Sequence, residues 1–307
     1  MITMKRKIIA QGLGGRTIFL PINWIRKYHL QPGDEIDIQE QSEALHITLP
    51  SPHKKKDKKA ITLQINQETA VASRMIIVNA YRAGFDLIKL NYDGPRTLIE
   101  EIVSQHLIGF EITNSQKPYI IESVSEPSYD NCEKLLERIF FMISDILNTL
   151  PNPQLRDKVH KVQSYDNFIK RTIAKGIYTP QESLFLWQFL SQLAQIARIC
   201  YHCNQDMLKM NREFNAIEKK IFSETKQMFS ILQKSYLKKD LSNLQDLHTL
   251  EHKIVRNQGK KLLEQKSSVP LYHLMTLARM IYLSQSPLLG ILEMRMFQDN
   301  KKQLEQI

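Results

Sequence analysis

Residues 5–49 have the sequence KRKIIAQGLGGRTIFLPINWIRKYHLQPGDEIDIQEQSEALHITL, and this stretch decides the fold of the first part of the chain. A basic triplet and two isoleucines lead into a glycine-rich turn at residues 12–15. Arg16 follows the turn and opens the β-branched and aromatic run Thr17–Leu20, which is typical of a strand. The pattern therefore predicts a β-hairpin with a glycine-rich turn.

The second half of the stretch predicts a short helix and two more strands. Pro21 ends the first strand run, and the helix 23–28 follows it with its first residue, an asparagine, as the N-cap. Residues 30–34, LQPGD, carry the proline, glycine and aspartate of a turn. Residues 35–38 and 44–49 then alternate between apolar and polar side chains, as strands do.

A unit of about 45 residues with four short strands buries little apolar surface alone, so dimerisation is its expected route to stability. The order of its elements resembles the swapped-hairpin DNA-binding domain of AbrB/SpoVT-type transcription regulators. The resemblance is carried by Gly15-Arg16, Leu20-Pro21, Arg26-Lys27 and the run from Leu30 to Glu35. It covers about a seventh of the chain and implies a dimeric swapped-hairpin β barrel that binds DNA.

Basic side chains of this domain are the predicted DNA contacts. They are Lys5, Arg6, Lys7, Arg16, Arg26 and Lys27. Residues 1–60 hold 11 Lys and Arg against 6 Asp and Glu, which is half of the net charge of +10. Such a surplus suits an anionic partner. The alternative is that the domain serves only as a dimer clasp whose cations are solvated.

Composition divides the chain into four parts. We expect the DNA-binding domain at 1–50, a basic linker at 51–59, a small α+β domain at 60–126 and a helical domain at 127–307. Prolines and lysines crowd the linker, which therefore cannot pack. A solvated linker is the favoured interpretation, and a loose basic arm on DNA is the alternative.

Strand and helix patterns alternate between residues 60 and 126 in the order βαβαββ. The expected strands are 61–65, 86–90, 110–113 and 119–122, and the expected helices are 67–82 and 95–106. This order predicts a small α+β sandwich. No catalytic spacing accompanies it, so we interpret it as a connector or as a sensor of an unknown ligand.

Beyond residue 127, apolar side chains recur every three or four positions, which predicts helices. They fall into two groups of three, with repeats at about 127–204 and 205–307. The third helices echo each other at Leu193–Arg198 and Leu277–Tyr282. This six-helix layout resembles PhoU, the phosphate-uptake regulator. Together with the first domain, it resembles a group of mainly archaeal phosphate-uptake regulators.

PhoU proteins carry a Glu and an Asp four residues apart on each third helix, and these acids help to hold metal clusters. The corresponding positions of this chain are Ala194 and Arg198 in the first half, and Ala278 and Tyr282 in the second. The acids left on neighbouring helices, Asp166 and Glu251, are too few for a cluster. We therefore do not expect the metal binding of that family.

A Cys-x-x-C spacing and two histidines four residues apart make a candidate zinc site. Its ligands would be Cys200, Cys203, His248 and His252. The favoured alternative is structural, because Cys200 continues an apolar stripe and histidines at helical spacing are common on surfaces.

The sequence contains no recognisable catalytic constellation. The glycine-rich turn precedes a strand rather than a helix, so it lacks the helix N-terminus of a dinucleotide-binding loop. No apolar run is long enough to span a membrane, no secretory signal is visible, and three scattered cysteines suit a reducing cytoplasm. We therefore expect a cytoplasmic, homodimeric, DNA-binding regulator of phosphate uptake, without cofactor or enzymatic activity. The alternative is an adaptor that docks on a phosphate transporter or a signalling protein.

Overall fold

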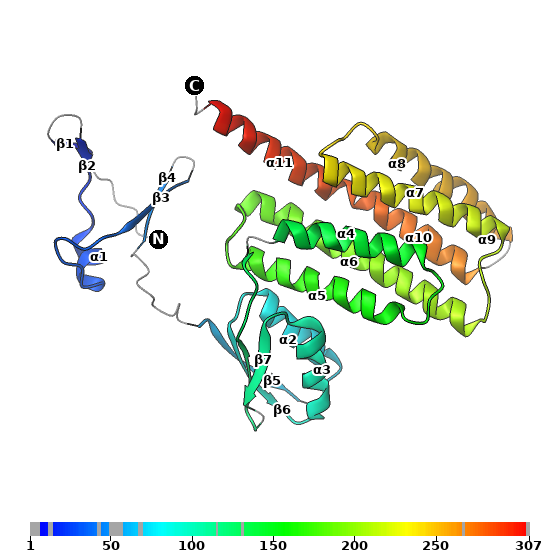
Figure 1. Cartoon of the computed structure of the whole chain (residues 1–307), viewed down its shortest axis with the longest axis horizontal. Coiled ribbons are helices and arrows are strands. Elements are labelled where there is room, and N and C mark those ends of the chain that lie inside the picture. The colour runs from blue at the N-terminus through cyan, green and yellow to red at the C-terminus, as the bar shows by residue number, and fades with distance from the viewer. Residues whose placement is uncertain are drawn as a thin grey trace. The chain divides into compact units, whose positions relative to one another are not determined.

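The computed structural model describes residues 7–11, 15–41, 44–48, 58–66, 70–114, 116–129, 132–265 and 268–304. The chain divides into two compact units, residues 1–57 and residues 58–307. Small sheets and a helical C-terminal region make up the fold (Figure 1), as the mixed α and β class predicted.

The first unit consists of two β-hairpins and one short helix. Its elements are β1 (Ile9–Gln11), β2 (Gly15–Thr17), α1 (Ile22–Lys27), β3 (Asp37–Gln41) and β4 (Ala44–Thr48). β1 pairs with β2 and β3 pairs with β4, both antiparallel. The pairing of Gln11 with Gly15 confirms the predicted hairpin, although residues 12–14 of its turn lie outside the described residues.

Two local predictions for this unit were wrong. The strand expected at 17–20 is β2, which ends at Thr17. The helix α1 begins at Ile22, one residue early, and its N-cap is Pro21 rather than an asparagine. The ring of Pro21 fixes φ near −62°, a value already suited to a helix start, so no side-chain cap is used.

The predicted turn after α1 is present. The carbonyl oxygen of Gln31 accepts a hydrogen bond of 3.0 Å from the backbone N–H of Asp34. Gly33 has φ of +102°, which only glycine adopts readily, and Pro32 precedes it. This is the geometry of a type II turn, and it explains why Pro-Gly-Asp stands between α1 and β3.

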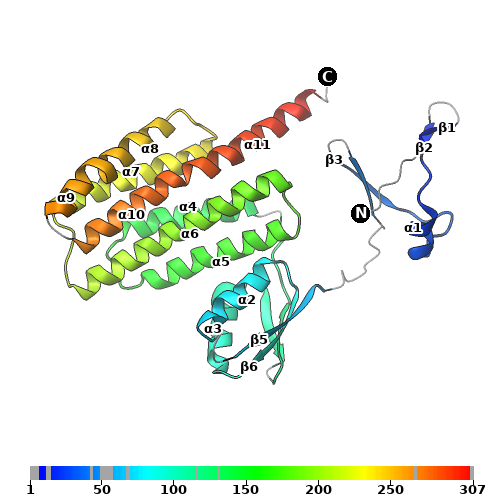
Figure 2. The same cartoon turned by 180° about the vertical axis from the view of Figure 1, so that it is seen from behind.

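The second unit begins with a four-stranded sheet and two helices, in the predicted order βαβαββ. Its elements are β5 (Ala60–Ile65), α2 (Ser73–Arg82), β6 (Leu87–Tyr92), α3 (Arg96–His106), β7 (Phe110–Asn114) and β8 (Tyr119–Ser123), with a 3₁₀ turn, η1 (Ala70–Ala72), before α2. The strand order is β5-β6-β8-β7. α2 and α3 cover one face of this sheet (Figures 1 and 2) and pack against a helix of the C-terminal region.

The last two lysines of the predicted linker belong to this unit instead. Lys58 forms an ion pair with Glu122. Lys59 donates its backbone N–H to Asp86 at 3.1 Å and its ammonium to the carbonyl of Ala83 at 3.0 Å. Both lysines are thus held by residues of the α+β domain rather than belonging to a free arm.

The C-terminal region is helical. Its elements are α4 (Cys132–Asn148), α5 (Leu155–Ala174), α6 (Pro180–Lys209), α7 (Ala216–Lys238), α8 (Leu244–Glu251), the π-helical η3 (His252–Gly259), α9 (Lys260–Gln265), α10 (Val269–Leu283) and α11 (Gln285–Leu304). α6 runs past the predicted repeat boundary at 204, and the next helix begins only at Ala216, where Asn215 provides the capping box with Glu218. The last predicted helix is divided at Ser284, and α11 extends it.

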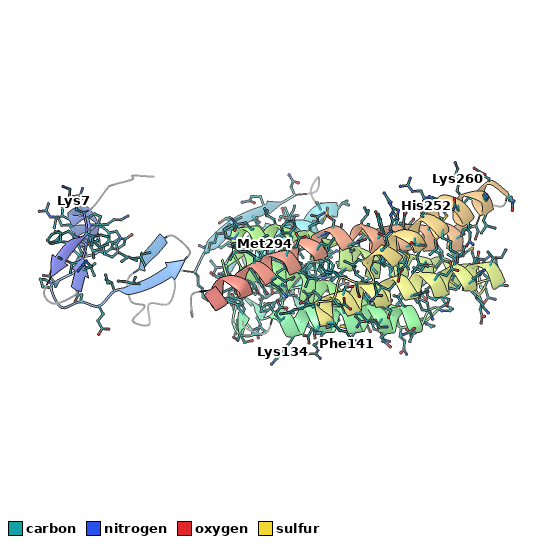
Figure 3. All side chains as sticks on the ribbon, turned by 90° about the horizontal axis from the view of Figure 1, so that it is seen from above. Lys7, Lys134, Phe141, His252, Lys260 and Met294 are labelled. Carbon is teal, nitrogen blue, oxygen red and sulfur yellow. The ribbon has the colours of Figure 1, made fainter. Side chains whose placement is uncertain are left out.

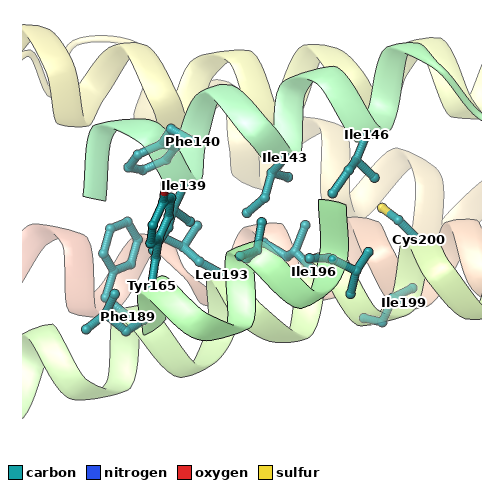
Figure 4. Packing of buried hydrophobic residues seen from close by; sticks show 14 of the residues in the cluster. Ile139, Phe140, Ile143, Ile146, Tyr165, Phe189, Leu193, Ile196, Ile199 and Cys200 are labelled. Atoms are coloured by element: carbon teal, nitrogen blue, oxygen red, sulfur yellow. The ribbon is translucent and has the colours of Figure 1, made fainter. Parts of the chain in front are cut away.

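The core of this region runs along α6, which packs against α4, α5, α10 and α11. Figure 4 shows Ile143 of α4 directed toward Ile196 of α6, and the ring of Phe140 lies 5.8 Å from that of Phe189 of α6. All four side chains are fully buried. Each such side chain contributes about 1.5–3 kcal/mol through removal from water, so the apolar stripes that predicted the helices also hold them together.

Arg171 of α5 joins the helical region to the α+β domain. Its side chain is completely buried, and all five of its N–H donors have acceptors. Nε and Nη2 bind Glu126 at 3.1 and 2.7 Å, and Nη1 donates to the carbonyl oxygens of Tyr81 and Phe85 at 3.1 and 2.7 Å. Nη2 also donates to Asp86, which accepts from Lys175 as well.

The two carboxylates around Arg171 stay ionised. Burial alone would raise the pKa of Asp86, but hydrogen bonds from Lys175 and the backbone of Lys59 outweigh it and lower that pKa. Burial likewise opposes the hydrogen bonds from Arg171 at Glu126, and the bonds prevail, so the pKa of Glu126 is lowered. The guanidinium is therefore matched by two negative charges.

Replacing Arg171 by methionine should lower the free energy of unfolding of the second unit by about 3–5 kcal/mol, because the half-buried Glu126 loses its cation and Asp86 keeps only Lys175. Urea denaturation followed by circular dichroism measures the change. As a control, Arg96→Met removes an exposed ion pair with Glu100, which is worth about 0.3–0.5 kcal/mol. Equal losses in the two variants would contradict a structural role for Arg171.

Candidate functional site

Four of the predicted DNA contacts lie in the described part of the first unit, and all four are exposed. They are Lys7, which Figure 3 labels, with Arg16, Arg26 and Lys27. Arg16 stands at the end of the hairpin, in register with Ala10. Arg26 and Lys27 form the last turn of α1. The other two predicted contacts, Lys5 and Arg6, lie outside the described residues.

Charge is segregated along this unit. Residues 5–27 contain six basic side chains and no acidic one, whereas residues 28–43 contain five acidic side chains and no basic one. None of the four described cations forms an ion pair with another described residue. Arg16 donates only to the carbonyl oxygen of its neighbour Gly15, at 3.1 Å. These cations are therefore available to an anionic partner.

Apolar side chains of the same unit are also unburied. Among the side chains of residues 7–48 that the structure describes, none is buried. The exposed large apolar residues are Ile8, Ile9, Ile18, Phe19, Ile22, Tyr28, Ile38 and Leu45. The side chain of Phe19, for example, is 70% exposed. Two-stranded hairpins that bury no core are at best marginally stable in water, so this unit needs another surface to cover it.

Ala194 and Arg198, which the PhoU resemblance compares with metal ligands, lie beside a buried ion-pair network. Beside Ala194 and Arg198, the buried Asp166 of α5 accepts a hydrogen bond from Arg82 of α2 at 3.0 Å. Lys170, one turn along α5, approaches the other oxygen of Asp166 at 2.7 Å. Two cations therefore neutralise the one carboxylate.

The second half of the helical region repeats this arrangement. Glu251 is 2% exposed and accepts a hydrogen bond of 2.6 Å from Arg279 of α10. Arg256 lies 3.8 Å from the same oxygen, and the Arg279 guanidinium lies over the ring of Tyr282. In the part of the chain that the structure describes, no three His, Cys, Asp or Glu side chains are grouped to hold a metal ion.

The candidate zinc ligands do not come together. Cys200 and Cys203 are both buried within α6, and burial raises the pKa of both thiols, that of Cys203 to about 12. His248 lies 3.4 Å from the hydroxyl of Tyr282, and His252 contacts Asn257. Both cysteines belong to the apolar stripe of α6, and no three metal-ligating side chains come together among the described residues, so the structure gives no support to a zinc site here.

A cavity of about 730 Å³ was not predicted from the sequence. It lies between α2, α3, α5 and α6. Its basic and histidine side chains are Arg74, Arg82, Arg156, Arg198, His106, His160 and His202. One signal was available: Arg156 and His160, and Arg198 and His202, are each four residues apart and so share a helix face. That the faces converge was not predictable.

Two histidines inside this cavity remain uncharged. The rings of His106 and His160 are 5.6 Å apart. Burial lowers the pKa of His106 to about 4, with help from His160, Arg74 and Arg82. Burial and the nearby Arg156 and Arg74 also lower the pKa of His160. The cavity thus resists further positive charge, as expected where cations already crowd together.

Comparisons of the chain with protein-family models, with curated proteins and with solved structures found no match. Among the helices that the structure describes, none has the length and apolar composition that crossing a membrane requires.

Replacing His106 by glutamine should flatten the pH dependence of stability between pH 7 and pH 5. The unfolded histidine takes up a proton below pH 6.5, whereas the folded one stays neutral down to about pH 4, so wild-type stability falls as the pH drops. At pH 5 this loss is about 2 kcal/mol for His106 alone. Urea denaturation at both pH values tests it.

The exposed His202 is the matched control, because it borders the same cavity. His202→Gln should keep the wild-type difference between the two pH values. If His106→Gln also keeps that difference, the buried neutral histidine does not contribute to acid sensitivity.

Proposed function

We propose that this protein is a homodimeric, DNA-binding transcription regulator whose first unit contacts DNA. The observation that carries the proposal is the combination of unpaired, exposed cations and uncovered apolar side chains in one small unit. Arg16, Arg26 and Lys27 sit in an acid-free segment, and the apolar residues around them lack a core. A second copy supplies the missing core, and DNA supplies the missing negative charge.

Dimerisation accounts for the apolar surface. Phe19 and Ile18 follow β2 directly, and Ile22 opens α1, so the exposed side chains lie on consecutive elements of the unit. Covering them with the same residues of a second copy would bury apolar area on both chains at once. The swapped-hairpin β barrel expected from the AbrB/SpoVT resemblance is one way to do so.

DNA contact accounts for the charge. In a dimer, each cation appears twice, so Arg16 and Arg26 together present four guanidinium groups. Phosphate oxygens accept bidentate hydrogen bonds from guanidinium groups, and guanine accepts the same pair in the major groove. Each neutralised phosphate releases counterions, so affinity should fall steeply as salt rises. The acidic segment 28–43 would be repelled from the duplex, which orients the unit on DNA.

The second unit provides the regulatory half of the proposal. Its helical layout resembles PhoU, and phosphate status is the signal that this resemblance implies. A signal that alters the packing of the helical region would have to favour one of two conformations of the dimer. It would change DNA affinity only if these two conformations bind DNA with different strengths.

Replacing Phe19 by glutamate should convert the dimer into a monomer, because it places a charge in the apolar surface that a second copy covers. Light scattering after size-exclusion chromatography should give about 35.9 kDa for the variant and about twice that for the wild type. Phe141→Glu changes a similarly exposed phenylalanine on α4 (Figure 3) and should leave the dimer intact. A dimeric Phe19→Glu variant would contradict this interface.

Replacing Arg16 and Arg26 together by alanine should weaken DNA binding at least about tenfold, since each good base contact is worth roughly 1–3 kcal/mol. The salt dependence should also become shallower, by about one unit of slope for each phosphate that is no longer neutralised. Retention of genomic DNA fragments, including the promoter of the protein's own gene and phosphate-transporter promoters, is measured across a salt series.

The control for this experiment replaces two arginines of the second unit, Arg96 and Arg138, by alanine. Its net charge is therefore the same as that of the variant that lacks Arg16 and Arg26. It should bind as the wild type does. If the two double variants bind equally, the Arg16 and Arg26 face does not contact DNA. If the wild type retains no fragment at any salt, the first unit is a dimer clasp only.

A further inference from the structure

The cavity of about 730 Å³ has a cationic wall built from both parts of the second unit. Arg74 and Arg82 come from α2 of the α+β domain, whereas Arg156 and Arg198 come from α5 and α6 of the helical region. Two of the elements that carry these arginines are packed rigidly together, because Arg171 fixes α5 to the end of α2. The distance between the arginines of α2 and the arginine of α5 is therefore fixed before a ligand binds.

Most of this positive charge has no counterpart in the protein. Asp166 is the sole carboxylate among the residues that line the cavity, and Arg82 and Lys170 already neutralise it. Arg156 reaches Glu101 at 3.4 Å on the rim. Arg74 and Arg198 form no ion pair or hydrogen bond with any described residue of the chain.

Histidines and apolar side chains complete the lining. His160 and His202 stand among the arginines, and the neutral ring of His106 forms part of the wall. Val71 and Met75 lie beside Arg74 and are 98% and 63% exposed. The cavity therefore offers donors for an anionic group and, next to them, an apolar surface for a carbon framework.

We propose that this cavity binds a small organic polyanion, with phosphate or carboxylate groups held by Arg74, Arg198 and Arg156 and its carbon framework against Met75 and Val71. Guanidinium groups match both kinds of oxyanion bidentately. A volume of about 730 Å³ lies within the range of small-molecule sites, roughly 300–1,000 Å³, and exceeds what a single phosphate ion fills.

A cation is the ligand that this site excludes. Four arginines around one carboxylate that is already paired would repel a metal ion, although the family position of the metal cluster, at Ala194 and Arg198, borders the same cavity. Arg198, at a position that the PhoU resemblance assigns to a carboxylate, favours an anionic ligand instead.

Such a ligand would bridge the α+β domain and the helical region. Contacts with Arg74 on α2 and Arg198 on α6 would tie the two together, so occupancy would stabilise their packing. This deepens the sensing role in the proposed function and rests on that role for its biological use. The binding site itself is measured without DNA.

The test is isothermal titration calorimetry on the full chain in 150 mM NaCl, with ATP, citrate and pyrophosphate as separate probes. We expect saturable binding of ATP or citrate with one site per chain. Binding of ATP alone identifies phosphate groups as the ligand chemistry, and binding of citrate alone identifies carboxylates. Pyrophosphate, which has no carbon framework, should bind more weakly than the probe that binds best.

Arg74→Gln and Arg198→Gln should each raise the dissociation constant at least about tenfold, because each removes a charge-assisted pair of hydrogen bonds. Arg96→Gln, on α3 and outside the cavity, should leave it unchanged. All three positions are exposed, so circular dichroism should show a retained fold in each variant.

Two results would overturn the proposal. One is the lack of saturable heat with all three probes, and the other is equal weakening by the cavity variants and by Arg96→Gln. Measuring the retention of DNA fragments by the same preparation distinguishes failure of the cavity proposal from failure of the proposed DNA-binding function. Wild-type protein that binds DNA but no probe refutes the cavity site alone, whereas protein that binds a probe but no DNA refutes the DNA-binding function alone.

Discussion

The buried guanidinium of Arg171 is the interaction on which the second unit depends. Its five N–H groups donate to two carboxylates and two backbone carbonyls, all of which belong to the α+β domain. Its faces lie over the rings of Tyr81 and Phe110, which exclude water from the ion pairs. Because an unpartnered buried charge is costly, a displacement of α5 from the α+β domain would leave Arg171 without these acceptors. In the observed arrangement α2 packs against α5.

Pairing of buried charges recurs at two related places in the helical region. Asp166 and Glu251 are each nearly inaccessible, and each is paired with arginine from a neighbouring helix. In both places the positive charge that balances the carboxylate is a guanidinium group. The carboxylate of Glu251 is paired with both Arg279 and Arg256. At Asp166 the surrounding arginines exceed the carboxylate, which leaves a cationic cavity.

The first unit shows the opposite situation, in which neither charge nor apolar surface is satisfied within the chain. Its cations are unpaired among the described residues, and Phe19 and five of its isoleucines are exposed. Larger domains bury such side chains in their own core, but four strands and a six-residue helix enclose too little volume. In the proposed function, association with a second copy and with DNA would resolve both deficits, whereas the second unit buries its apolar side chains in its own core.

Local pattern by itself determined most elements of this protein. The βαβαββ order and the helices of the C-terminal region followed from periodicity, because the side chains that repeat every two, three or four residues are neighbours on one element. Their ends were less predictable: β2 ends at Thr17 and α6 runs through to Lys209, because pairing and packing partners decide where an element stops. Only the tertiary structure decided the contacts between elements. Arg171 meets Asp86 across 85 residues and Glu126 across 45, and the four cavity arginines come from three helices. The cysteines of α6 are buried, whereas His248 is exposed. No periodicity relates such distant residues, because their proximity depends on the path of the whole chain.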